Sequence, residues 1–211
     1  MSPPPVTEAA TLTLKPGVNV DGDTEESHAW AGILKTICEQ EGFISLTCGA
    51  KVEDERSLVL MVDWTSHQSH LDFIARPLYQ PFMKRVAPLI DNLTMHHYHP
   101  SSPSLLASSP VVEIAILFNT TPTYYSTNLT SFRDALRDSK SEGLTGVEIA
   151  EVLEELAKEE GGDKGRTAML FVGWESVDAH MRFRESETFK NNIATLRDGV
   201  GAIEMVGLLA I

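Results

Sequence analysis

The sequence repeats one pattern of aromatic and polar residues in its two halves. Residues 58–73 read LVLMVDWTSHQSHLDF, and residues 168–183 read AMLFVGWESVDAHMRF. Both stretches contain W-x-S-x-x-x-H-x-x-F, and every matched position recurs at the same offset. The matched pairs are Trp64 and Trp174, Ser66 and Ser176, His70 and His180, and Phe73 and Phe183. Because tryptophan and histidine are rare, four identities at one offset indicate an internal duplication.

Each half predicts the same order of strands and helices. The first half predicts strands at about 6–14, 43–51, 58–64 and 93–99, with helices at about 25–40 and after Ser66. The second half predicts strands at about 111–118, 144–150, 168–174 and 202–209, with helices at about 124–140 and after Ser176. Gly42 and Gly143 stand where helices commonly end, and Ser66 and Ser176 are favourable N-caps. The order β-α-β-β-α-β is that of the ferredoxin-like unit.

The third strand of each half is apolar at consecutive positions, as in Leu58–Val62 and Met169–Val172. A strand of this kind needs cover on both faces, whereas the helices of its own half cover only one. The sequence therefore predicts an α+β protein in which two ferredoxin-like repeats form a single-chain, pseudo-dimeric α/β barrel. The predicted repeats are residues 1–100 and 111–211, and the Ser/Pro-rich segment 101–110 is the predicted linker.

Composition narrows the classes of partner. Apolar residues make up 42% of the 211 positions and charged residues 22%, which is typical of a globular protein. The net charge of −13 disfavours nucleic acid and anionic membrane surfaces as partners. No stretch is long and apolar enough to cross a bilayer, and the N-terminal residues do not resemble a secretory signal. We therefore expect a cytoplasmic protein.

The βαββαβ order together with the W-x-S-x-x-x-H-x-x-F pattern resembles the antibiotic-biosynthesis-monooxygenase (ABM) branch of the dimeric α/β-barrel superfamily. The resemblance covers both halves. It implies a ligand pocket between each sheet and its own helices, with Trp64 or Trp174 near the mouth. Similar members include cofactor-independent oxygenases of polyketide anthrones, quinol monooxygenases and haem-degrading enzymes. Positions corresponding to the histidine of the haem-degrading members are Met83 and Ile193, which disfavours haem.

The histidines are distributed unequally between the halves. Six of the seven lie in the first half, and the strand predicted at 93–99 contains His96, His97 and His99. On an alternating strand, Met95, His97 and His99 share one face and His96 lies on the other. Histidine is the usual general base near neutral pH. We therefore expect the active pocket in the first half, with His70 and His96 or His97 as candidate bases.

The remaining candidates would form the wall of that pocket. Trp64 is expected to shape the pocket, and the predicted substrate contacts are Trp30, Phe73, Tyr79, Phe82 and Met95. In the second half a further pocket would be lined by Tyr124, Tyr125, Asn128 and Arg182. The structural alternatives are that the tryptophans are core residues, that His70 and His180 only stabilise the fold, and that the other histidines form a solvated strand edge.

No glycine-rich nucleotide motif, P-loop or nucleophile elbow is present in the sequence, so no cofactor is expected. A metal site is disfavoured because His96, His97 and His99 do not share one face. The leading hypothesis is a cofactor-independent monooxygenase of secondary metabolism, acting with dioxygen on a small aromatic or polyketide-like substrate. The alternatives are a cyclase, decarboxylase or isomerase on the same barrel, or a non-catalytic, stress-associated barrel that binds a hydrophobic ligand. Assembly beyond the internal pseudo-dimer stays open.

Overall fold

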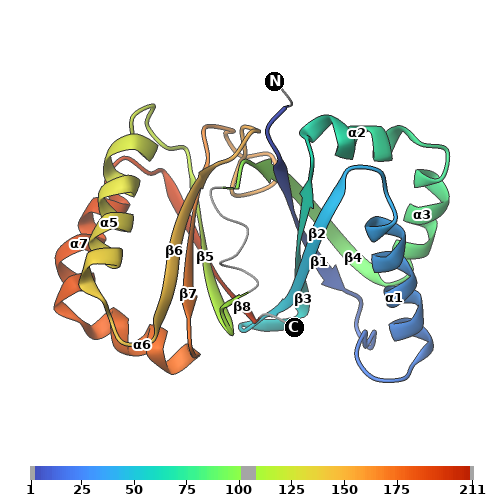
Figure 1. Cartoon of the computed structure of the whole chain (residues 1–211), viewed down its shortest axis with the longest axis horizontal. Helices are drawn as coiled ribbons and strands as arrows, with labels where there is room; N and C mark the ends of the chain where they lie inside the picture. Colours follow the sequence, from blue (N-terminus) through green and yellow to red (C-terminus); the bar gives the residue numbers. More distant parts are fainter. Residues whose placement is uncertain (1–2, 101–107, 210–211) are drawn as a thin grey trace. The chain divides into compact units, whose positions relative to one another are not determined.

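The computed structural model describes residues 3–100 and 108–209 (Figure 1). The described residues fall into two compact units, one ending at His97 and the other beginning at Tyr98. Most of the predicted linker, residues 101–107, lies outside the described residues. Among the residues that are described, no helix has the length and apolar character needed to cross a membrane.

The first unit follows the predicted order of strands and helices. Its elements are β1 (Val6–Leu14), α1 (Glu25–Cys38), β2 (Phe43–Lys51), β3 (Asp54–Trp64), α2 (His67–Ala75), α3 (Tyr79–Val86) and β4 (Ile90–Tyr98). The strands form a sheet in the order β4-β1-β3-β2, in which β1 and β2 both run antiparallel to β3. The βαββαβ order of the first repeat is therefore confirmed.

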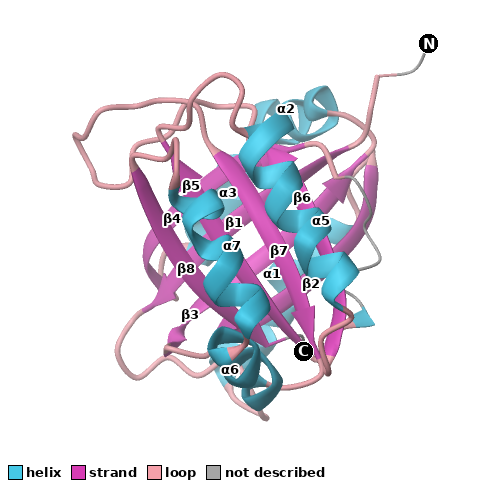
Figure 2. Ribbon diagram, turned by 90° about the vertical axis from the view of Figure 1, so that its left-hand side faces the viewer, coloured by secondary structure: helices cyan, strands magenta, loops and turns pink. Residues whose placement is uncertain are grey.

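The second unit repeats this arrangement. Its elements are β5 (Val111–Phe118), η1 (Tyr125–Leu129), α5 (Thr130–Ser139), β6 (Leu144–Glu151), β7 (Ala168–Trp174), α6 (Val177–Glu185), α7 (Glu187–Arg197) and β8 (Ala202–Leu209). The sheet order is β8-β5-β7-β6, with β5 and β6 antiparallel to β7. Figure 2 shows α5 and α7 lying across the strands of this unit. The helix predicted at 124–140 begins with the π-helical turn η1 rather than as a regular α-helix.

The serines predicted to cap helices do so in both units, whereas Gly42 and Gly143 lie in the turns after the helices, directly before β2 and β6. Gly42 and Gly143 have φ angles of +84° and +78°, in the left-handed region that favours glycine. The hydroxyl oxygens of Ser66 and Ser176 accept backbone N–H bonds three residues on and cap α2 and α6. These local signals explain why both repeats turn at the same places.

The second helical region is divided into two helices in each unit, for different reasons. In the first unit, α2 ends at Ala75 because Arg76 precedes Pro77 and adopts an extended conformation. Pro81 lies in the first turn of α3, where proline is tolerated, so it does not interrupt this helix. In the second unit Ser186 is extended and caps α7, which divides the region without a proline.

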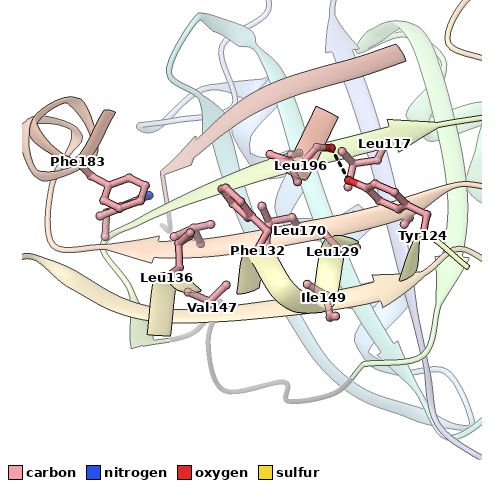
Figure 3. Close-up of a cluster of buried hydrophobic side chains, with 14 of the residues drawn as sticks. Leu117, Tyr124, Leu129, Phe132, Leu136, Val147, Ile149, Leu170, Phe183 and Leu196 are labelled. Carbon is pink, nitrogen blue, oxygen red and sulfur yellow. Dashed lines mark hydrogen bonds between the residues drawn. The ribbon is translucent and has the colours of Figure 1, made fainter. Parts of the chain in front are cut away.

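Helices cover one face of each sheet and enclose a hydrophobic core there. In the first unit, alternate residues of β3 from Leu58 to Trp64 point into this core, while Val59 and Met61 on the opposite face are also buried. In the second unit the core contains Leu117, Phe132, Leu170 and Phe183, among others (Figure 3). Both central strands are therefore buried on both faces, as their sequences predict.

Candidate functional site

A cavity of about 50 Å³ lies inside the first unit, between its sheet and its helices. Its wall contains all five predicted substrate contacts, namely Trp30, Phe73, Tyr79, Phe82 and Met95. Trp64 and His70 line it as well. The rings of Phe73, Tyr79 and Phe82 contact one another edge to face or tilted, with ring centres 5.2–5.8 Å apart. The lining is therefore aromatic and aliphatic, with few polar groups.

The polar groups of the cavity converge on the carboxylate of Glu8. The Trp64 indole Nε1–H donates a hydrogen bond of 3.0 Å to Glu8 Oε2, and His70 Nε2 lies 3.3 Å from the same oxygen. The Trp64 and His70 rings are stacked, with centres 5.2 Å apart. Burial raises the pKa of Glu8 above its ordinary value, although the Trp64 hydrogen bond and nearby His97 oppose the shift. This carboxyl group therefore holds a proton more strongly than an exposed glutamate.

His70 is also bonded on its other side. Its Nδ1 shares a hydrogen bond of 2.7 Å with Nε2 of His97, in which one ring donates and the other accepts. The His97 ring in turn lies 4.5 Å, centre to centre, from the ring of His67. Because His70 begins the second turn of α2 and His97 lies near the end of β4, only the tertiary fold brings them together.

The two predicted strand histidines occupy different places. Met95 lines the cavity and His97 contacts His70, so these two share a face of β4 as the alternation predicts. His97 does not line the cavity itself but lies behind His70. His96 is buried but is not part of the cavity wall, so the structure does not bring it to the site.

Glu8 is the site residue that the sequence interpretation missed, although a signal for it exists. Residues 6–12 read VTEAATL and residues 111–117 read VVEIAIL, which share Val, Glu, Ala and Leu at alternate positions. A glutamate on the inward face of a strand is costly unless it has partners, so its repetition points to a shared role for Glu8 and Glu113.

The second unit contains a related but simpler arrangement. The Trp174 indole donates to Glu113 Oε2 over 3.4 Å, and His180 Nε2 lies 3.2 Å from Glu113 Oε1. The His180 side chain is 21% exposed, whereas that of His70 is 2% exposed. The matched pairs of the repeat are 110 residues apart. At this offset, Val177 and Gly207 correspond to His67 and His97.

The four residues predicted to line a pocket in the second unit lie in different surroundings. Tyr124 is buried, and its hydroxyl donates a 2.6 Å bond to the carbonyl oxygen of Leu196 (Figure 3). The Asn128 amide donates to backbone carbonyls at the end of α7. Arg182 is exposed. Of these four residues, Tyr125 is the one that lines an open groove of about 460 Å³, together with other residues of the unit. Tyr124 and Asn128 therefore bond to the C-terminal end of α7.

Solved structures of other proteins match the fold of this chain. No family model and no curated protein matches the sequence. The structure of an anthrone oxidase-like protein matches over 98% of this chain and 91% of its own, with a TM-score of 0.73 and 14% identity. A candidate monooxygenase of Fusobacterium nucleatum matches over 100% of this chain and 94% of its own, with a TM-score of 0.62 and 12% identity. Another candidate monooxygenase, from Lactobacillus acidophilus, matches over 98% of this chain and 94% of its own, with a TM-score of 0.61 and 11% identity.

These likenesses extend along nearly the whole chain and through both repeats. They confirm the predicted fold of the chain. A shared fold at such low identity does not carry over a reaction or a substrate. The chain has the duplicated ferredoxin-like fold seen in these anthrone oxidase-like and monooxygenase structures.

Proposed function

We propose that the first unit is a cofactor-independent oxygenase of a small aromatic substrate, with the Glu8–His70 pair as proton acceptor. The observation that carries the proposal is this buried pair on the wall of an otherwise apolar, aromatic cavity. Titratable groups enclosed in an apolar pocket are a common arrangement for general acid–base catalysis. The fold shared with an anthrone oxidase-like protein supports this choice of reaction.

The proposed reaction converts an activated CH₂ group beside aromatic rings to a carbonyl. The Glu8–His70 pair accepts one proton from the CH₂ carbon, and the adjacent carboxylate stabilises the resulting imidazolium. The substrate carbanion gives two electrons to dioxygen, and the resulting peroxide anion takes up one proton from the pair to form a hydroperoxide. Loss of the second C–H proton then breaks the O–O bond and releases water. One oxygen atom ends in the product and the other in water, and the two C–H bonds supply the four electrons.

The size of the cavity limits how a substrate enters. A volume of about 50 Å³ holds dioxygen or a few water molecules, since one water needs about 10–15 Å³ by this measure, but no polycyclic substrate. Met83 and Met95 form part of the wall, and methionine side chains change rotamer readily. An aromatic substrate therefore requires these side chains, together with half-exposed Tyr79, to move aside.

Oxygen uptake with an anthrone, compared between His70→Ala and His180→Ala, tests the proposal. Loss of a general base lowers rates by about 100-fold or more. We expect His70→Ala to lose at least this much of kcat and His180→Ala to retain the parental value. Uptake that is unchanged in His70→Ala, or lost equally in both variants, would contradict a base in the first unit.

A second candidate is a non-catalytic barrel that holds a hydrophobic ligand. It is favoured by the repetition of the Trp–Glu–His arrangement in both units, which is expected of residues that stabilise a fold. Binding of an anthrone without oxygen uptake or conversion would support this function. Conversion of the substrate without oxygen uptake would instead indicate a cyclase, decarboxylase or isomerase that uses the same proton acceptor.

A further inference from the structure

Three histidines of the first unit form a row that ends at the cavity. His67 is half-buried, whereas His97 and His70 are buried. The His67 and His97 rings are 4.5 Å apart between centres, and a 2.7 Å hydrogen bond joins His97 to His70. We propose that His67, His97 and His70 are a proton relay between the cavity and the surface. This inference deepens the proposed function and rests on it for the identity of the reaction.

Imidazole is suited to each link of the row. A neutral imidazole accepts a proton on one nitrogen and releases another from the opposite nitrogen, which no other side chain does near neutral pH. His70 has one nitrogen toward Glu8 and the other toward His97. His97 presents Nε2 to His70, so its Nδ1 is the atom from which a proton continues to His67.

The burial of the Glu8–His70 pair explains why a relay is needed. A proton accepted in this apolar cavity cannot pass directly to bulk water while the wall is closed, since His70 is 2% exposed. A charge that stays on a buried side chain also costs free energy. A path through His97 to half-buried His67 removes the proton without opening the cavity.

The second unit supports this interpretation by contrast. It keeps the Trp–Glu–His arrangement but has Val177 and Gly207 in place of His67 and His97. His180 is ten times as exposed as His70, so it exchanges protons with water directly. The two extra histidines are therefore associated with the enclosed site.

The relay step balances without any further reactant. A proton enters His70 at Nε2, a second leaves its Nδ1 for His97 Nε2, and a third leaves His97 Nδ1 for His67 and then water. The last transfer is direct or passes through one water molecule. Each ring ends neutral, with its proton on the opposite nitrogen. Return of a proton by the same path, when the peroxide anion is protonated, restores the starting tautomers.

Exchange of the His70 ring proton with water tests the relay in the absence of substrate. In the full-length chain with ¹⁵N-labelled histidine, NMR measures this exchange in the parent, in His97→Gln and in His67→Val. Glutamine keeps a hydrogen bond to His70 but does not relay a proton, and valine is the second unit's residue at position 177. We expect exchange to slow at least tenfold in both variants, while the His180 ring proton serves as an unchanged internal control.

Equal exchange at His70 in the parent and in both variants would overturn the relay. If His97→Gln fails to fold, His67→Val alone decides, because His67 is half-buried and contributes little to the core. Slowing at His70 and His180 alike would also overturn it, since that indicates a general change in structure. Absence of oxygen uptake in the parent contradicts the proposed function but leaves the exchange result standing.

Discussion

The two units of this chain share a carboxylate, an indole and an imidazole in nearly the same arrangement but enclose them to different degrees. In both, a glutamate on the first strand accepts a bond from a tryptophan at the end of the third strand and lies 3.2–3.3 Å from a histidine. In the first unit that histidine is buried and bonded to His97. In the second, the histidine is partly exposed. The repeated arrangement is therefore common to both units, and the burial of His70 and its bond to His97 set the first unit apart.

The histidine that is added in the first unit, His97, lies beside the cavity. His97 lies on the face of β4 that includes Met95, beside the cavity, so a single side chain connects the shared arrangement to the unit's other histidines. Glycine at position 207 removes that connection in the second unit. The first unit thus differs from the second by two histidines, and its Glu-paired histidine is the more enclosed.

The largest expected effect concerns the part that the units share. Trp64 and Trp174 are both fully buried, and truncating a buried tryptophan to alanine costs about 3–5 kcal/mol. We expect Trp64→Ala and Trp174→Ala to lower the free energy of unfolding of their units by similar amounts, measured by urea denaturation. A much smaller loss for Trp64→Ala would break the equivalence and indicate that Trp64 is kept for the site rather than for stability.

A smaller effect of the same kind is expected at Gly42 and Gly143, which directly precede β2 and β6. A Cβ atom at Gly42 would lie 2.5 Å from Ser69 Cβ, and one at Gly143 would lie 2.5 Å from Ala179 Cβ. Alanine therefore adds steric overlap to the cost of a positive φ, together about 2–4 kcal/mol at either position.

Gly17 provides the matched control for these variants. Its φ is +84°, but nothing lies within 4 Å of a Cβ atom there, so Gly17→Ala pays only the backbone cost. Thermal or urea unfolding should rank Gly17→Ala well above both other variants in stability. Equal losses at all three positions would show that the helix–strand contact is not tight in either unit.

The third prediction tests the difference between the units through pH. Burial raises the pKa of Glu8 above 4.5, so the folded state binds this proton more tightly than the unfolded chain. This contribution to stability is present below pH 4.5 and is lost as pH rises through the folded-state pKa. Glu8→Gln should therefore gain stability relative to the parent as pH increases above 4.5, measured by urea unfolding at several pH values.

Glu113→Gln is the comparison for this measurement. It removes the corresponding carboxyl group from a site whose histidine is partly solvated. If both variants change the pH dependence of the free energy of unfolding equally, the two carboxyl groups titrate alike. The greater burial of the first site then has no effect on its carboxyl group. A Glu8→Gln profile parallel to that of the parent would show that the Glu8 pKa is not raised.

Much of the fold was predictable because its signals are local. The strand bounds of β1, β2 and β5 agree with the predictions at both ends, since each strand is flanked by turn or helix-cap residues. The paired serines marked the helix starts correctly, but the paired glycines mark the starts of β2 and β6 rather than helix ends. The π-helical start of the second unit's first helix was missed because no residue pattern distinguishes a π-turn from an α-helix.

The site was only partly predictable. Aromatic residues of the cavity were found because helix and strand periodicity places them on inward faces. Glu8 was missed because a glutamate is ordinarily assigned to a surface, and only its pairing with Trp64 and His70 makes its burial acceptable. Tyr124 was assigned to a pocket because its bond to Leu196, 72 residues away, cannot be read from the sequence.

By itself, the sequence determined that the chain is a duplication, where its elements begin and end, and which half holds the histidines. These properties follow from local backbone preferences and from repeated residue patterns. Only the tertiary structure decided that His70 lies between Glu8 and His97 and that the cavity beside them has a volume of only about 50 Å³. Such distances depend on how a helix packs on a sheet, and contacts between residues 27 to 62 positions apart are not encoded in any local pattern.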